Sequence, residues 1–296
     1  MINWNDLKYL LATVQAGSYS LAAVELGVNR TTVARRIEAL ETQLGSPLLE
    51  NSSAGYTLTE QGQQALKSAR QLEEEINRLE SQLTQGEEVL RGSLRVAAPL
   101  GLGPEFMQEL AAFSFQYPEI RLELINTLDP ISSLNQRTAD VAITVGHELP
   151  DHISGSLISE LERALYASKN YLRQYPAELR FSEHRWIGWG KDMPHTQVAK
   201  WMQHNLETTT TIAAHVNSWH ALRAAVEEGI GIAHLWCFLA KDMPKVDKIS
   251  DVSTELTIGL WLCHHKDVQN NRRTTAFMQA MKPLLKQRTQ GSTSGA

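Results

Sequence analysis

Cysteine is scarce in this chain of 296 residues, which contains only Cys237 and Cys263. Neither belongs to a Cys-x-x-Cys pair or to a Cys/His spacing that binds zinc. A disulfide framework and a zinc finger are therefore excluded, and we expect two buried thiols in a reducing cytosol. No other metal or cofactor is predicted.

Long hydrophobic runs are missing as well. No apolar run approaches the ~20 residues that a membrane span needs, and the first six residues, Met-Ile-Asn-Trp-Asn-Asp, lack the basic and apolar segments of a signal peptide. These absences predict a cytoplasmic protein without a membrane partner. Positive charge is not in excess, because the formal net charge is -5. A surface that binds nucleic acid must therefore be basic locally.

Motifs of catalysis are also lacking. The chain has no Gly-x-Ser-x-Gly and no P-loop. Gly229-Ile230-Gly231 lacks the third glycine of a dinucleotide loop and follows a helical pattern, so close packing explains it better. His264-His265 has no carboxylate or cysteine at metal spacing. We predict that the protein is not an enzyme.

Three short helices are predicted in the first 45 residues. The first ends at Gly17, the second covers residues 21–26 with Ser20 as its N-cap, and Gly45-Ser46-Pro47 stops the third. Gly27-Val28-Asn29 joins the second helix to the third, which is a helix-turn-helix arrangement. Apolar residues at spacings of three and four mark the inner faces: Leu7, Leu10, Leu11 and Val14, then Val33, Ile37, Leu40 and Leu44.

The outer edge of the third helix is polar and basic. In a helix-turn-helix, the start of the second helix of the pair reaches base edges in the major groove, where arginine pairs with guanine and threonine contacts thymine methyls or phosphates. A basic cluster is also often a merely solvated face, and residues 1–60 hold four basic against six acidic side chains. Position after a glycine-containing turn favours DNA binding. The predicted DNA-binding residues are Ser20, Arg30, Thr31, Thr32, Arg35, Arg36 and Asn51.

A hairpin and a long helix are predicted next. Residues 48–51 and 56–59 flank a tip of small residues and form a wing, and Thr59 caps a helix that runs to about residue 89. About thirty residues give ~45 Å of helix, too long to bury its apolar stripe against a small domain. We predict pairing with a second copy, in a homodimer or homotetramer, with folding back on its own chain as the alternative. The stripe comprises Leu66, Ala69, Leu72, Ile76, Leu79 and Leu83.

From residue 93 onward, strand and helix patterns alternate. This alternation predicts open, parallel-rich sheets covered by helices, which bind ligands at the carboxyl ends of their strands. Inward-facing residues include Ile120, Leu122 and Leu124 of one strand, and Phe277, Ala280, Met281 and Leu284 of the last helix. The predicted strands are 94–98, 120–125, 141–145, 186–189, 211–216, 229–233 and 256–263, and the predicted helices are 104–117, 218–228 and 272–286.

The order of motifs resembles the LysR-type transcriptional regulators over nearly the whole chain. The DNA-binding half carries Gly17-Ser18-Tyr19-Ser20-Leu21-Ala22-Ala23, Leu26-Gly27-Val28, Thr32-Val33-Ala34-Arg35-Arg36-Ile37 and Leu58-Thr59-Glu60-Gln61-Gly62. The second half carries Gly92-Ser93-Leu94-Arg95-Val96, Tyr117-Pro118-Glu119-Ile120, Asp140-Val141-Ala142-Ile143 and Glu228-Gly229-Ile230-Gly231-Ile232. Two departures are Ala34, where the family usually has serine, and Leu49-Glu50-Asn51, where it usually has Phe-x-Arg.

The resemblance implies an α+β multidomain protein. It would have a winged helix-turn-helix (1–60), a linker helix for dimerisation (61–91), an α/β two-lobed domain like periplasmic binding proteins (92–288) and a flexible tail (289–296). Lobe I would contain 92–161 and 265–288, and lobe II 162–264. By family position, the residues that line an effector cleft are Leu100, Gly101, Leu102, Gly146, His147, Trp189, Asn217 and Ser218. Ordinary packing or turn chemistry is the alternative role for each.

These features predict a sequence-specific DNA-binding regulator whose operator binding responds to a small-molecule effector. Many relatives have serine or threonine where Leu100 stands, which implies either a less polar effector or one anchored elsewhere. Two alternatives are a ligand-independent architectural DNA binder and an α/β enzyme fused to a helix-turn-helix. The effector, the operator and the choice between activation and repression stay open.

Overall fold

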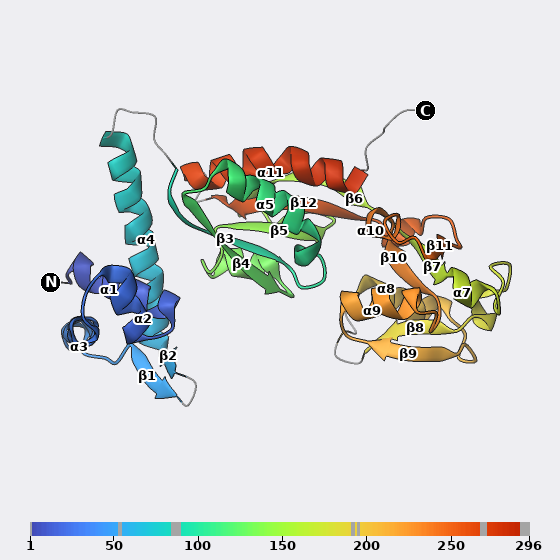
Figure 1. Cartoon of the computed structure of the whole chain (residues 1–296), viewed down its shortest axis with the longest axis horizontal. Helices are drawn as coiled ribbons and strands as arrows, with labels where there is room; N and C mark the ends of the chain where they lie inside the picture. Colours follow the sequence, from blue (N-terminus) through green and yellow to red (C-terminus); the bar gives the residue numbers. More distant parts are fainter. Residues whose placement is uncertain are drawn as a thin grey trace. The chain divides into compact units, whose positions relative to one another are not determined.

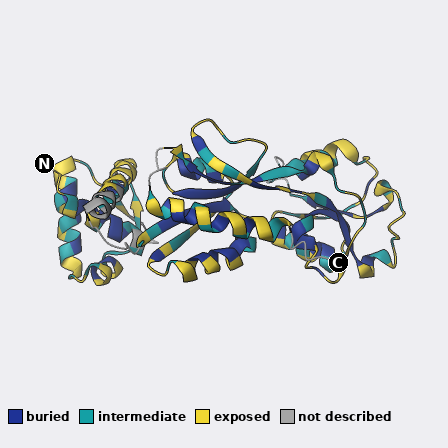
Figure 2. Ribbon diagram, turned by 90° about the horizontal axis from the view of Figure 1, so that it is seen from above, coloured by how far each residue is buried: buried dark blue, intermediate teal, exposed yellow. Residues whose placement is uncertain are grey.

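The computed structural model describes residues 2–52, 55–83, 90–190, 193, 196–266 and 271–290. The chain divides into two compact units, Met1–Glu88 and Val89–Ala296 (Figure 1). Each unit has buried apolar clusters of its own, and Figure 2 shows buried residues in both units with exposed residues on their outer faces.

The first unit is a winged helix-turn-helix. Its helices are α1 (Trp4–Ala16), α2 (Tyr19–Leu26) and α3 (Arg30–Leu44), and β1 (Leu49–Ser52) pairs antiparallel with β2 (Gly55–Leu58). The three helices and the hairpin confirm the prediction. The N-cap of α2 is Ser18, whose hydroxyl accepts from the backbone N–H of Leu21, so the prediction of Ser20 as cap was wrong by two residues. Gly27 ends α2 at φ +65°, a left-handed conformation that glycine adopts without strain.

Helix α4 (Glu60–Leu83) leaves the wing with Thr59 as its cap, as predicted, because Thr59 Oγ1 accepts from the Gly62 N–H at 2.9 Å. Leu66 and Ala69 are buried in the first unit, whereas Leu72 is 45% exposed. Only the later part of the predicted stripe is therefore available to another chain. The predicted continuation over residues 84–89 lies outside the described residues, as do the side chains of Leu79 and Leu83.

The second unit contains two lobes. Lobe I has a five-stranded sheet of order β4-β3-β5-β12-β6, in which β3 runs parallel to β4 and β5, and β12 antiparallel to β5 and β6. Helices α5 and α11 pack on one face, and α6 packs on the other. The elements are β3 (Gly92–Pro99), η1 (Gly103–Phe106), α5 (Met107–Gln116), β4 (Ile120–Thr127), α6 (Pro130–Asn135), β5 (Val141–Gly146), β6 (Ile153–Leu161), β12 (Ile258–His265) and α11 (Arg272–Gln290).

Lobe II has a three-stranded antiparallel sheet of order β10-β7-β11 and a parallel pair, β8-β9. Its strands are β7 (Arg163–Ser168), β8 (Trp186–Trp189), β9 (Ile212–Val216), β10 (Ala233–Trp236) and β11 (Val246–Lys248). Its helices are α7 (Lys169–Leu172), η2 (Phe181–Glu183), α8 (Gln197–Asn205), α9 (Trp219–Glu227), α10 (Cys237–Ala240) and η3 (Thr254–Leu256).

Several predictions about the second unit need correction. Strand β12 belongs to lobe I, so the predicted return of the chain near His264 was wrong and lobe II ends before Ile258. Strands β6, β7 and β11 were missed.

Two residues predicted to face inward are not fully buried. Leu124 is 40% exposed on the edge strand β4, and Leu285 rather than Leu284 is fully buried on α11. Helix α11 also continues through residues 289 and 290 of the predicted tail, and residues 291–296 lie outside the described part.

Candidate DNA-binding and effector sites

The start of α3 presents polar side chains to solvent because its apolar residues face inward. Val33, Ile37 and Leu40 are buried, whereas Arg30, Thr31 and Arg35 are exposed and Thr32 is half-buried. Among the described residues, neither Arg30 nor Arg35 makes an ion pair. The helix therefore offers two uncommitted guanidinium groups at its exposed edge.

Arg36 has a different environment. Its Nη1 lies 3.1 Å from Oδ1 of Asp6, and its guanidinium lies 6.0 Å from the ring of Tyr9. Asp6 is 3% exposed, so this ion pair holds α3 against α1 inside the unit. Of the other predicted DNA-binding residues, Ser20 is exposed in the first turn of α2 and the side chain of Asn51 lies outside the described residues.

The wing is fixed to the helices by two sets of contacts. Glu41 of α3 accepts hydrogen bonds from the backbone N–H groups of Leu48 and Leu49, at 2.7 and 3.2 Å. Tyr19 of α2 stacks on Tyr56 of β2 with ring centroids 4.4 Å apart. Burial, reinforced by Tyr56 and Glu41, raises the pKa of Tyr19 to about 12, so its phenol stays neutral.

Sequence reasoning missed Asn29. It is the N-cap of α3, yet its side chain makes no capping hydrogen bond and is exposed next to Arg30. Its position in the turn before the helix was the available signal, because the first residues of this helix are those that approach DNA.

In the second unit, three of the predicted effector residues form the turn after β3. This turn approaches the start of α9 in lobe II: a Cβ placed on Gly101 would lie 2.7 Å from Cβ of Trp219. Ser218 caps α9 by accepting from the N–H of Ala221 at 3.1 Å, and Asn217 precedes it, exposed. The structure therefore brings Gly101 close to the Asn217-Ser218 segment.

Charged side chains link the lobes nearby. Glu105 of η1 lies 3.8 Å from Arg223 and 3.9 Å from His220, both on α9. His220 is exposed and Arg223 is partly exposed, and both distances are near 4 Å, so these pairs are weak and sensitive to salt. They can hold the lobes together without locking them.

The remaining predicted effector residues vary in their surroundings. Leu100 is half exposed, but Leu102 is buried in the core. The carbonyl of Gly146 accepts from Trp261 Nε1 at 2.9 Å, and His147 is exposed. The indole N–H of Trp189 is buried without a hydrogen-bond partner in the described part of the chain.

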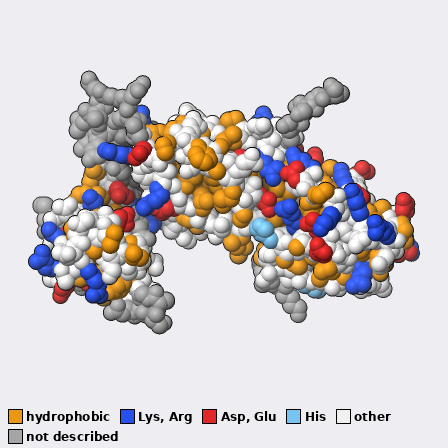
Figure 3. Space-filling model, in the orientation of Figure 1, with side chains coloured by type: hydrophobic (Ala, Val, Ile, Leu, Met, Phe, Trp, Pro, Cys, Tyr) orange, Lys and Arg blue, Asp and Glu red, His pale blue; other side chains and the backbone are white. Residues whose placement is uncertain are grey.

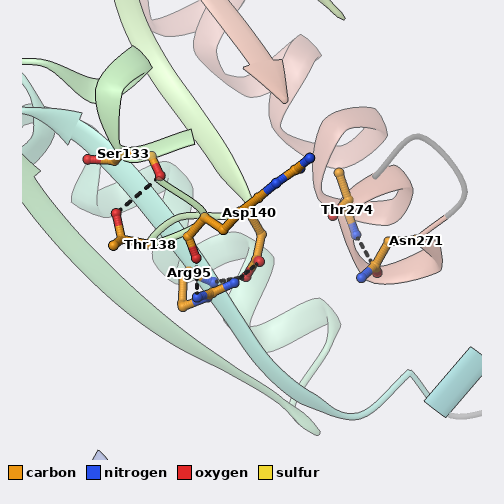
Figure 4. Close-up of polar contacts among 7 residues, drawn as sticks. Arg95, Ser133, Thr138, Asp140, Asn271 and Thr274 are labelled. Carbon is orange, nitrogen blue, oxygen red and sulfur yellow. Dashed lines mark hydrogen bonds and ion pairs between the residues drawn. The ribbon is translucent and has the colours of Figure 1, made fainter. Parts of the chain in front are cut away.

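A buried ion pair lies at the other end of the lobe I sheet. Arg95 of β3 pairs with Asp140, which precedes β5, and also donates to the carbonyl of Arg137 at 2.8 Å (Figure 4). Asn271 caps the start of α11 nearby (Figure 4). Ligands bind at the carboxyl ends of such strands, and this cluster lies at the opposite end of the sheet. We therefore assign the ion pair a structural role.

A pocket of about 450 Å³ opens on lobe II, and none of the predicted effector residues lines it. Among the described residues, no group of three His, Cys, Asp or Glu side chains could hold a metal ion. No helix in the described ranges is long and apolar enough to span a bilayer. The pocket is lined by Asn170, Tyr171, Arg173, Gln174, Tyr175, Arg185, Glu228, Gly229 and Ile230.

Comparison with known families gives two matches. Residues 4–63 match the family described as "Bacterial regulatory helix-turn-helix protein, lysR family", and residues 87–286 match "LysR substrate binding domain". The second match alone covers more than half of the chain.

Curated relatives are similar over part of their length. The chain is 31% identical over 172 residues to the HTH-type transcriptional activator TtdR of Escherichia coli K12, an alignment that covers 58% of this chain and 55% of TtdR. It is 30% identical over 184 residues to the HTH-type transcriptional regulator CrgA of Neisseria meningitidis, covering 60% of this chain and 61% of CrgA. The alignments thus span little more than half of these relatives.

Solved structures share the fold. A full-length OxyR variant from Pseudomonas aeruginosa has a TM-score of 0.72 at 16% identity, covering 100% of this chain and 99% of that one. Full-length CbnR complexed with its target DNA has a TM-score of 0.61 at 20% identity, covering 95% and 99%.

Proposed function

Because the chain belongs to the LysR family, whose members are transcription regulators and not enzymes, we propose that it binds an operator in double-stranded DNA under the control of a small-molecule effector. As a bacterial DNA-binding protein it would act in the cytoplasm. One observation supports DNA binding most directly: Arg30 and Arg35 stand exposed at the start of α3 without ion-pair partners among the described residues.

The roles of the seven predicted DNA-binding residues follow from their surroundings. We assign Arg35 to a base edge, because an exposed arginine in the early turns of this helix can pair bidentately with guanine. Arg30, Thr31 and Thr32 would contact phosphates or bases beside it, with Ser20 and Asn51 at the margins. Arg36 would act by positioning α3 through Asp6.

The test of this proposal is operator binding by the Arg35→Ala variant. An operator is first selected from random duplex DNA, and affinity is then measured at fixed salt. Loss of a bidentate contact should weaken the binding free energy by about 1–3 kcal/mol. Arg35→Lys should recover only part of this loss, because lysine restores the charge but not the two parallel N–H donors of the guanidinium. Lys241→Ala, which removes an exposed charge from the second unit, is the matched control. Unchanged affinity of Arg35→Ala would remove Arg35 from base recognition.

We propose that subunits pair through two surfaces. The exposed part of the α4 stripe begins at Leu72, and lobe I exposes Phe115 on α5 with Leu124 and Leu128 on or beside the edge strand β4. In the view of Figure 3, charged side chains gather on the second lobe and hydrophobic or uncharged ones cover much of the first. Two such surfaces allow a homodimer or a homotetramer, and exposed apolar patches commonly mark interfaces.

We propose that the effector binds between the lobes, near the turn after β3 and the start of α9. The close approach of Gly101 to Trp219 and the weak Glu105–Arg223 pair support this placement. Gly146, His147 and Trp189 complete the proposed lining with Leu100, Asn217 and Ser218, while Leu102 supports the turn from the core. An effector would change DNA binding by preferring one arrangement of the lobes.

A further inference from the structure

Arg163 occupies an unusual place in the second unit. It begins β7, two residues after β6 ends at Leu161, where the chain passes from lobe I into lobe II. In the β10–β7 ladder it stands directly opposite Trp236. Its guanidinium carbon lies 3.5 Å from the centre of the Trp236 ring, which is the stacked geometry of a cation–π pair.

The described part of the chain offers this guanidinium no anion. Nε and Nη1 are buried and have no hydrogen-bond partner in the described part of the chain, and no ion pair to Arg163 occurs there. Burial lowers the pKa of Arg163 to about 9. Native proteins rarely leave a buried charge unpaired, because the lost hydration is not recovered. Nε and Nη1 are themselves closed to solvent, although the residue as a whole is only partly buried.

The surroundings of Arg163 connect to the proposed effector site. The Trp236 ring lies 6.1 Å from that of Trp219, whose backbone begins α9 and whose Cβ faces Gly101 of lobe I. The indole N–H of Trp219 is also buried without a partner among the described residues. Along this path the unsatisfied groups are donors, on Arg163 and on Trp219, so the matching ligand group is an acceptor with negative charge.

We propose that Arg163 binds the carboxylate of a small organic acid, with Trp236 as the planar wall beside it, and that this acid is the effector. The inference rests on the proposed function and names the chemical class of its ligand. It also resolves the alternatives raised by Leu100 in favour of an effector anchored elsewhere than at that turn.

The test is thermal unfolding of the full chain without DNA, using ligand pairs that differ only in charge. The probes are benzoate and benzamide, succinate and succinamide, and lactate and lactamide, at equal ionic strength. We expect at least one carboxylate to raise the melting temperature by about 2–4 °C above its amide. Arg163→Gln should abolish this difference, and Arg185→Gln, an exposed arginine of the same lobe, should retain it.

A second measurement separates ligand binding from a structural role. Without any ligand, Arg163→Gln should melt at the same temperature as the parent or higher, because the variant no longer buries an unpaired charge. A melting temperature lowered by more than about 4 °C would make Arg163 structural and overturn the proposal.

Three other results would also overturn it: equal stabilisation of Arg163→Gln and the parent, no carboxylate better than its amide, or sulfate as effective as the best carboxylate. Since no DNA is present, each of these leaves operator binding by α3 to be judged separately.

Discussion

Adjacent arginines in α3 have different roles because the helix turns by about 100° per residue. Arg35 lies on the exposed edge, whereas Arg36 reaches back to the buried carboxylate of Asp6. Of these two arginines, only Arg35 is free for the proposed recognition of DNA. Under the proposed function, the local positive charge that faces DNA would come mainly from Arg30 and Arg35, in a chain whose net charge is negative.

His234 makes the stability of lobe II depend on pH. It is buried, Nε2 lies 3.1 Å from Ser253 Oγ, and burial together with Arg163 lowers its pKa to about 3. The unfolded chain takes up this proton near pH 6.5, but the folded chain does not. Stability should therefore be full above about pH 7 and fall as the pH drops, by about 2 kcal/mol between pH 7 and pH 5.

Urea unfolding at these two pH values, followed by tryptophan fluorescence, checks this expectation, because Trp201 lies 4.5 Å from the imidazole. His234→Gln should reduce the loss between pH 7 and pH 5, leaving the smaller contribution of His184, whose pKa is also lowered by burial. His220→Gln, at an exposed histidine, is the control and should behave like the parent. An unchanged pH dependence in His234→Gln would contradict the assignment.

At the scale of elements, α4 serves two purposes along its length. Its first turns complete the core of the first unit through Leu66 and Ala69, and its apolar stripe then continues into solvent at Leu72. A helix that leaves its own domain with an exposed apolar stripe is stabilised by pairing with another helix. The same helix would thus set the distance between two DNA-binding units.

Leu72→Glu should weaken subunit association. A charge in a helix–helix seam loses hydration without gaining a partner, so we expect the dimerisation constant to fall by about tenfold or more. Sedimentation equilibrium over a range of concentrations measures it. Gln71→Glu places the same charge on the neighbouring exposed position and should leave association unchanged. A Leu72→Glu variant that associates like Gln71→Glu would show that α4 does not form the interface.

At the scale of the whole molecule, control by an effector requires the two lobes to have more than one arrangement. Contacts between them include weak ion pairs from Glu105 to α9, the Arg288–Asp242 pair at 2.8 Å, the stacking of Phe106 on Phe238 and the tight approach of Gly101 to Trp219. Of these, the approach at Gly101 depends on the absence of a side chain at residue 101. This steric limit gives the lobes a close state that a larger residue would forbid.

Gly101→Val should hold the lobes apart, because its Cβ alone would lie 2.7 Å from Trp219 Cβ, closer than two carbon atoms can approach. We expect a larger radius of gyration by small-angle X-ray scattering and loss of any effect of effector on operator affinity, with basal DNA binding retained. Leu157→Val, at an exposed residue of β6 outside the proposed effector site, is the control. A Gly101→Val protein with unchanged scattering would show that this contact does not limit closure.

Local patterns in the sequence were enough to predict the elements whose structure depends on residues near one another along the chain. The helix-turn-helix, its glycine caps, the wing and the Thr59 cap follow from spacing and capping chemistry. Local patterns did not predict the strands that pair with partners distant in the sequence. Strand β12 joins the lobe I sheet between β5 and β6, and β7 lies between β10 and β11, since sheet order is set by packing across lobes.

The amino-acid sequence by itself therefore determined the class of protein, its two-part organisation and the basic edge of α3, because short-range periodicity and turn residues encode these directly. Only the tertiary structure decided that Arg36 pairs with the buried Asp6, that Leu285 rather than Leu284 is fully buried, and that Arg163 stacks on Trp236 without an anion among the described residues. These depend on which residues meet across more than twenty positions of chain, or on the exact rotation of a helix, and no local pattern records that.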